Sequence, residues 1–125
     1  MQPVLWAEDE EGDQVLIRSA LEDTPAAARV RFARDGAEAV DQATRQTPRL
    51  IVLDVNMPNV GGVEALRRIR GEPGLRDVPV VMFSTARNED EVAACESLGI
   101  KAFVRKPTDY EEFCKTVRGI VELAA

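Results

Sequence analysis

The sequence contains no histidine. Histidine is the side chain whose ordinary pKa lies closest to neutral pH, and it is a common zinc ligand. Its absence therefore excludes the most frequent general base and most zinc sites. Any phosphohistidine chemistry must use a histidine of another protein.

Cysteines and long apolar runs are also scarce. Cys95 and Cys114 are the only cysteines, with no CxxC spacing, and we expect both to be packing residues. The segment Met1–Trp6 runs straight into acidic residues and is too short for a secretory signal, so isolated thiols indicate a reducing cytoplasm. No apolar stretch approaches the ~20 residues of a membrane span. We therefore expect a cytoplasmic protein without membrane association.

Positive charge is in deficit, with 16 Lys and Arg against 22 Asp and Glu and a net charge of -6. This balance argues against a general nucleic-acid-binding surface and is compatible with binding a divalent cation. The length of 125 residues, 45% of them hydrophobic, fits one domain with a real core. We expect a single domain over residues 1–125, without an output domain, that acts through its own surface.

Short apolar segments alternate with segments of helical periodicity along the chain. The predicted strands are 3–8, 28–33, 50–54, 79–84 and 101–106, and the predicted helices are 11–23, 36–46, 61–70, 88–98 and 108–123. This alternation indicates βαβ units and a parallel sheet. Leu50–Leu53 and Val80–Phe83 are continuously apolar, as in strands covered on both faces. Arg29–Phe32 alternates, and Lys101–Arg105 alternates in part. Strands two and five therefore suit the edges, which gives an α/β, flavodoxin-like, doubly wound (βα)5 fold with strand order 2-1-3-4-5.

Local signals support the helix boundaries. Three predicted helices begin with a polar N-cap residue and a glutamate three positions later: Thr108 with Glu111, Asp35 with Glu38, and Asn88 with Glu91. Such pairs form capping boxes or related starts. Gly99 stands where the helix over 88–98 should end.

Four predicted strands end on chemically useful side chains. Glu8 and Asp9 follow the first strand, Asp54 ends the third, Ser84 the fourth and Lys106 the fifth. In a parallel sheet these ends share one edge, where doubly wound folds bind ligands. Three acids this close would repel by roughly 4 kcal/mol per pair at 4 Å, so we expect a hard divalent cation, magnesium (or manganese), among them.

Lys106 and Ser84 complete the predicted site. Lys106 would pair with the Asp54 carboxylate or with a phosphoryl group on it, and Ser84 would donate to a phosphoryl oxygen. A carboxylate can act as the nucleophile in phosphoryl transfer, so an aspartyl phosphate at Asp54 is the predicted chemistry, with the cation and Lys106 offsetting the negative charge.

Four motifs carry a resemblance to a known family: Ala7–Glu10, Leu53–Pro58, Pro79–Ser84 and Lys106–Pro107. In this order and spacing, the chain resembles the response-regulator receiver family of two-component signalling over about residues 3–122. The resemblance implies that Asp54 is the phosphoacceptor. It also implies that Asp9 binds the metal directly, Glu8 through water, and Asn56 through its backbone carbonyl.

The resemblance further implies a conformational switch. Ser84 and Lys106 would contact the phosphoryl group, and the rotamer of Phe103 would couple to the movement of Ser84. Phe103 lacks the hydroxyl of the tyrosine often found at this position. The peptide between Lys106 and Pro107 resembles the family's cis bond, although the generic X–Pro statistics favour trans.

Phosphate lifetime depends on three further positions. Spacing favours Ser84 over Thr85 as the switch hydroxyl, so Thr85 stands where many relatives carry a smaller residue and would slow access to the phosphoryl group. In the family, Asn56 and Ala86 occupy positions that influence dephosphorylation. The sequence alone leaves the lifetime open.

The resemblance also implies partners. The phosphoryl donor would be a histidine kinase or a histidine phosphotransfer protein, and the surface of segments 88–98, 101–106 and 108–123 would bind a downstream protein. The segments Arg70–Val78 and Ser84–Asp90 resemble stand-alone receivers associated with phytochrome-type kinases. Monomer and homodimer both remain open.

Two other functions compete with this prediction. The same fold could serve as a phosphorylation-independent interaction module, but the complete acid set argues against that. An aspartyl-nucleophile hydrolase of the haloacid-dehalogenase type would place an aspartate two residues after Asp54, where Asn56 stands. A nucleotide or flavin site would need a glycine-rich loop after the first strand, where acids crowd instead.

Overall fold

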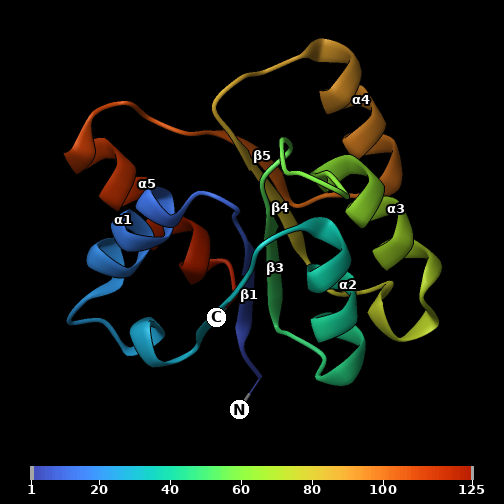
Figure 1. Cartoon of the computed structure of the whole chain (residues 1–125), viewed down its shortest axis with the longest axis horizontal. Coiled ribbons are helices and arrows are strands. Elements are labelled where there is room, and N and C mark those ends of the chain that lie inside the picture. Colours follow the sequence, from blue (N-terminus) through green and yellow to red (C-terminus); the bar gives the residue numbers. More distant parts are fainter. Residues whose placement is uncertain (1, 125) are drawn as a thin grey trace.

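The computed structural model describes residues 2–124 and contains one parallel five-stranded sheet with helices on both faces (Figure 1). The strand order β2-β1-β3-β4-β5 confirms the predicted doubly wound topology. The strands are β1 (Val4–Ala7), β2 (Val30–Ala33), β3 (Leu50–Leu53), β4 (Val80–Ser84) and β5 (Ala102–Arg105). The α-helices are α1 (Glu11–Leu21), α2 (Gly36–Arg45), α3 (Gly62–Gly71), α4 (Glu89–Leu98) and α5 (Tyr110–Glu122).

The sheet separates two apolar cores. Successive side chains of a strand point to opposite faces, so β1 sends Leu5 toward α2 and α3 and Trp6 toward α1 and α5. Strands β1, β3 and β4 are buried along their whole length, whereas the edge strands β2 and β5 are partly exposed. The continuous and the alternating sequence patterns thus correspond to central and edge strands. Cys95 and Cys114 are buried, as expected of packing residues.

Two of the three predicted helix starts are confirmed. The Asp35 and Asn88 side chains accept hydrogen bonds from the backbone N–H groups of Glu38 and Glu91. The third prediction, Thr108 with Glu111, is wrong by one residue. Asp109 is the N-cap of α5 and accepts from the Glu112 N–H at 3.0 Å, because the helix begins at Tyr110. None of the helices within residues 2–124 is long and apolar enough to cross a bilayer.

The chain also forms two short 3-10 helices that the periodicity did not reveal. They span η1 (Pro25–Ala28) and η2 (Pro73–Leu75), and each begins with a proline, whose fixed φ suits a first helical position. Because η1 extends to Ala28, β2 begins at Val30 rather than at the predicted residue 28. Gly99 ends α4 with φ of 88°, as predicted for a C-cap glycine.

Candidate functional site

The carboxyl ends of β1, β3, β4 and β5 meet at the edge of the sheet opposite the N-terminus (Figure 1). There the fold brings together the predicted residues Glu8, Asp9, Asp54, Ser84 and Lys106. Four of them are almost fully buried, and Asp9 is half-buried. Buried charged groups are rare unless they are paired, so this edge is chemically distinct from the rest of the surface.

Three carboxylates form a cluster that suits a divalent cation. Glu8, Asp9 and Asp54 each offer an oxygen, and the three oxygens lie within 4.8 Å of one another. Oδ1 of Asp9 is buried and accepts no hydrogen bond from the residues that the structure describes. A buried oxygen without a donor is costly, and a hard cation with oxygen ligands would satisfy it. The residues present therefore fit divalent metal binding.

The Lys106 ammonium is the positive centre of the site. Nζ donates to Oε1 of Glu8 at 2.7 Å, to Oδ2 of Asp54 at 2.9 Å and to Oδ2 of Asp13 at 3.0 Å. It also lies 5.6 Å from the centre of the Phe83 ring. An ammonium has three N–H donors, and these three carboxylates use all of them.

Asp13 is a site residue that the sequence analysis missed. It lies on the first turn of α1 and reaches Lys106 from that helix. An acid in a first helical turn is common for electrostatic reasons alone, so nothing in the sequence distinguished Asp13 from Glu11. The neighbouring Gln14 donates to the Glu8 carbonyl at 2.7 Å and so ties α1 to the end of β1.

Burial and ion pairing shift the pKa values of Glu8 and Lys106 in opposite directions. Burial raises the pKa of Glu8 to about 7, although the hydrogen bond from Lys106 counteracts part of the rise. Burial alone would lower the pKa of Lys106, but its hydrogen bonds to Glu8 and Asp54, and their charges, outweigh burial and raise it. The ammonium therefore stays charged while several acids share it.

Asp54 is held on both carboxylate oxygens. Oδ2 accepts from Lys106, and Oδ1 accepts from the backbone N–H of Asn56 at 3.1 Å. Behind it, Gly62 packs so closely that a Cβ there would collide with the Asp54 carbonyl oxygen. The N-terminus of α3 can approach the acid loop only because residue 62 has no side chain, a requirement that the sequence analysis did not identify.

A backbone hydrogen bond joins Ser84 and Lys106. The Lys106 N–H donates to the Ser84 carbonyl at 2.7 Å, and the Ser84 hydroxyl accepts from the Ala86 N–H at 3.4 Å. Accepting that bond leaves the hydroxyl proton free to donate. Thr85 and Ala86 are exposed and extend from the site toward α4.

The predicted cis peptide between Lys106 and Pro107 is wrong in this structure. Residues 2–124 contain no cis peptide bond, so this bond is trans. Trans is the lower-energy form of X–Pro by about 0.5–1 kcal/mol, and here it coexists with all three Lys106 ion pairs.

Phe103 lies on β5, half-buried against the core beside α4. The guanidinium of Arg87 lies 5.6 Å from the centre of its ring, so a charged side chain from the loop after β4 covers the aromatic side chain. A rotation of Phe103 would have to displace this guanidinium. Asn56, by contrast, is exposed at the rim of the acid loop.

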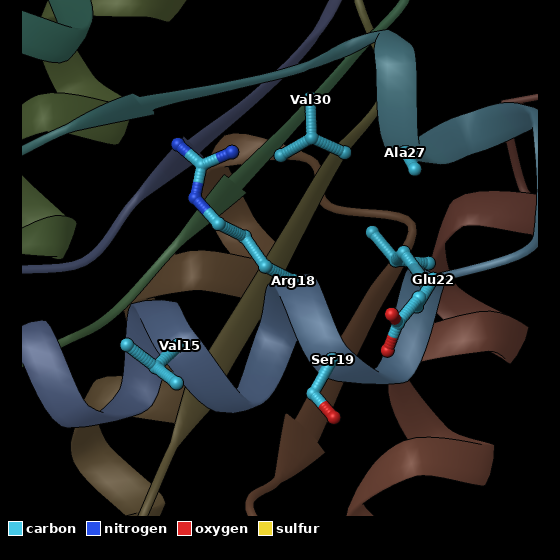
Figure 2. A pocket seen from close by; sticks show the side chains of 7 residues that line it. Val15, Arg18, Ser19, Glu22, Ala27 and Val30 are labelled. Atoms are coloured by element: carbon cyan, nitrogen blue, oxygen red, sulfur yellow. The ribbon is translucent and has the colours of Figure 1, made fainter.

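A second hollow has no connection with these acids. It has a volume of about 410 Å³ and is lined by residues of α1, η1 and β2. Figure 2 shows the Arg18 side chain reaching from α1 toward Val30, with Val15, Ser19 and Glu22 on the same helix or just after it. The Arg18 guanidinium lies 4.7 Å from the centre of the Phe32 ring, and the lining includes none of Glu8, Asp9 and Asp54.

Comparison with known proteins identifies the family of this chain. The family model described as response regulator receiver domain matches residues 4–118. The chain is 32% identical over 124 residues to response regulator Rcp1 of Synechocystis sp., covering 94% of this chain and 84% of that protein. It is 31% identical over 125 residues to the protein named "Probable methanogenesis regulatory protein FilR2" of Methanothrix harundinacea, covering 95% of this chain and 81% of that protein.

Solved structures give the same result. The phosphorylated cyanobacterial phytochrome response regulator RcpA superposes with a TM-score of 0.87 at 30% identity, covering 98% of this chain and 94% of that one. The Mn(2+)-bound form of Rcp1 superposes with a TM-score of 0.86 at 31% identity, covering 96% and 91%. These likenesses agree with the predicted similarity to phytochrome-associated receivers. The chain therefore belongs to the response regulator receiver domain family, whose members are phosphoacceptor signalling switches of two-component systems.

Proposed function

We propose that Asp54 is the phosphoacceptor of this receiver. The observation that carries the proposal is the convergence of Lys106, Glu8 and Asp9 on the Asp54 carboxylate. Asp54 and Glu8 each accept from the Lys106 ammonium and from a backbone N–H, but Glu8 is fully buried, whereas Asp54 keeps 6% of its surface exposed to an incoming phosphoryl donor. Its two donors hold the Asp54 carboxylate in a fixed orientation, which is what a nucleophile in phosphoryl transfer needs.

The cation of this site is magnesium, with manganese as a substitute. Asp9, Asp54 and the backbone carbonyl of Asn56 would hold it directly, and Glu8 would hold it through water. The orphaned Asp9 oxygen supports this ligand set. When bound, magnesium supplies positive charge next to the phosphoryl oxygens.

The transfer itself is a substitution at phosphorus. One Asp54 carboxylate oxygen forms a bond to phosphorus as the bond from phosphorus to the donor's histidine nitrogen breaks, and the nitrogen keeps the bonding electron pair. Lys106 donates hydrogen bonds to the transferred phosphoryl oxygens, and the Ser84 hydroxyl donates a hydrogen bond to one of them. Since this chain has no histidine, the donor is a histidine kinase or a histidine phosphotransfer protein.

The phosphoryl group changes the surface formed by α4, β5 and α5. Movement of Ser84 toward the phosphoryl oxygens would alter the loop that carries Arg87 and thereby the packing of Phe103. That surface would bind a downstream protein, not nucleic acid. Asn56, Thr85 and Ala86 border the acceptor and would set the lifetime of its phosphate.

We place this receiver in the cytoplasm as a single domain that receives its signal from a phytochrome-type kinase. The likeness to phytochrome response regulators supports the kinase, and the two free, buried cysteines support a reducing compartment. The chain would catalyse no reaction other than the gain and loss of its own phosphoryl group.

The test is incubation with acetyl phosphate and magnesium, followed by mass spectrometry of the intact protein. We expect the wild type to gain the mass of one phosphoryl group and Asp54→Asn to gain none. Chelation of the metal should abolish labelling. If the wild type stays unlabelled under conditions that label another receiver, the proposal fails, and a phosphorylation-independent interaction module becomes the better explanation.

A further inference from the structure

The three partners of Lys106 are not equivalent. The Glu8 side chain is fully buried, and its second oxygen accepts the Glu10 N–H at 3.2 Å. Asp54 is also nearly buried. The Asp13 side chain is 29% exposed and reaches Lys106 from α1, a helix that contributes no other charged group to the ammonium.

We propose that Asp13 is a positioning residue that competes with the phosphoryl group of Asp54 for the ammonium of Lys106. This inference rests on the proposed role of Asp54 as phosphoacceptor. In the unphosphorylated protein Asp13 holds the third N–H of Lys106 at 3.0 Å. Phosphorylation then transfers that donor to a phosphoryl oxygen.

Charge explains why phosphorylation would shift Lys106. Transfer replaces a carboxylate of charge -1 by a phosphoryl group of about -1.5 to -2 with three acceptor oxygens, so the ammonium gains a stronger partner. Since its three donors are already used, Lys106 must give up a bond in order to bind a second phosphoryl oxygen.

Burial explains why Asp13 is the partner released. A fully buried Glu8 left without its ammonium would be an uncompensated charge in the interior, which is strongly unfavourable. Asp13 instead borders a hollow of about 330 Å³ that is also lined by Thr85, Pro107 and Tyr110. Water there can hydrate the released carboxylate at little cost.

The first experiment measures the initial rate of Asp54 labelling by acetyl phosphate. Asp13→Asn keeps the size of the side chain and removes its charge. We expect labelling to be roughly two- to fivefold faster than in the wild type, the range of a partly exposed ion pair. Glu11→Gln is the matched control, since it removes one exposed charge from the same helical turn, and it should leave the rate unchanged.

A double-mutant cycle with Lys106→Met separates competition from simple repulsion of the anionic donor. If Asp13 acts through Lys106, then Asp13→Asn has no effect in the Lys106→Met background. An equal acceleration in both backgrounds would overturn the inference, as would an unchanged rate in the single Asp13→Asn variant. A wild type that is not labelled at Asp54 at all would instead remove the proposed function, and the inference with it.

A spectroscopic readout needs no phosphorylation and no Lys106 variant. The nitrogen-15 signal of the Lys106 ammonium should be visible in the wild type because three carboxylates protect its protons from exchange. Asp13→Asn should shift this signal and accelerate its exchange with water, and Glu11→Gln should not. In phosphorylated wild type the signal should no longer respond to Asp13→Asn. If Asp13→Asn changes neither the position nor the exchange rate of this signal in the unphosphorylated protein, the inference is overturned.

Discussion

Two basic side chains join distant segments of this molecule, and their partners differ in kind. Lys106 donates to the acidic side chains of Glu8, Asp13 and Asp54. Among residues 2–124, Arg70, at the end of α3, donates only to neutral backbone carbonyls, those of Leu75, Arg76, Val78, Leu98 and Gly99. Lys106 is thus surrounded by acidic groups, and Arg70 by the dipoles of backbone carbonyls.

The difference separates a site that changes from a connection that does not. Any anion or cation that enters the acid cluster alters the balance around Lys106, because charges interact over several ångströms at low effective dielectric. An ion that enters the acid cluster leaves the hydrogen bonds between Arg70 and its carbonyl acceptors unchanged. Burial lowers the pKa of Arg70, with Asp77 opposing the change, whereas the pKa of Lys106 is raised by its acidic partners. Arg70 therefore fixes the end of α4 while the Lys106 site can change state.

The largest expected effect comes from removing the charged centre. Lys106→Met leaves Glu8 and Asp54 buried without their ammonium, so we expect the free energy of unfolding to fall by about 3–5 kcal/mol. Urea denaturation in the presence of a chelator measures it. Magnesium should restore more stability to this variant than to the wild type, because the acids then have no other cation. A loss below about 1 kcal/mol would show that the acids are not held as charges.

Arg70→Met should have the second largest effect. Loss of the guanidinium leaves several carbonyls without their donor, and we expect about 2–3 kcal/mol of destabilisation. Hydrogen exchange should accelerate around residues 75–78 and 98–101, the segments that Arg70 joins. Magnesium should stabilise this variant and the wild type equally, in contrast to Lys106→Met.

Arg67→Met is the matched control for that experiment. Arg67 lies on the same helix, is exposed and pairs only with Glu64, at 3.6 Å. Its loss should change the free energy of unfolding by less than about 0.5 kcal/mol. If both arginine variants lose the same stability, then the carbonyl contacts of Arg70 contribute no more than a surface ion pair.

The same contrast explains what the sequence could predict. Lys106, Asp54 and Ser84 follow strands, and the ends of parallel strands meet whatever the loops do, so their proximity followed from the strand pattern alone. Arg70 and Asp13 escaped prediction because their partners lie on separate loops or on another element, at distances that only the packed fold sets.

Fine local geometry also could not be predicted from the sequence. Thr108 and Asp109 are both good N-cap residues, and the choice between them depends on where α5 docks rather than on propensity. Gly62 could be read as an ordinary helix-start glycine until the packing against the Asp54 carbonyl was known. Proximity of the site residues was thus predictable, whereas caps, close approaches and multi-partner side chains required the fold.

Asp35 reverses the arrangement at Arg70, since one charged group here accepts hydrogen bonds from neutral donors. Among Lys106, Arg70 and Asp35, its replacement should have the smallest effect. Its Oδ1 accepts from the Glu38 N–H at 2.8 Å, and its Oδ2 accepts from the Asn59 amide at 3.3 Å. Asp35→Ala should cost about 1 kcal/mol at neutral pH, as for other N-caps. Asp35→Asn retains a capping oxygen and loses only the charge, so it isolates the carboxylate.

The pH dependence then gives the sign of that charge effect. The Glu38 hydrogen bond, more than the Asn59 contact, lowers the pKa of Asp35 in the folded protein. A lowered pKa means that the carboxylate contributes stability at pH values above its unfolded pKa of about 3.9. That contribution is lost as the pH falls through the folded value. Urea denaturation of the wild type and Asp35→Asn should therefore give curves that differ near neutral pH and converge toward pH 3. A difference that stays constant over this range would show that the charge of Asp35 contributes nothing to stability and that the cap acts through its hydrogen-bonding shape alone.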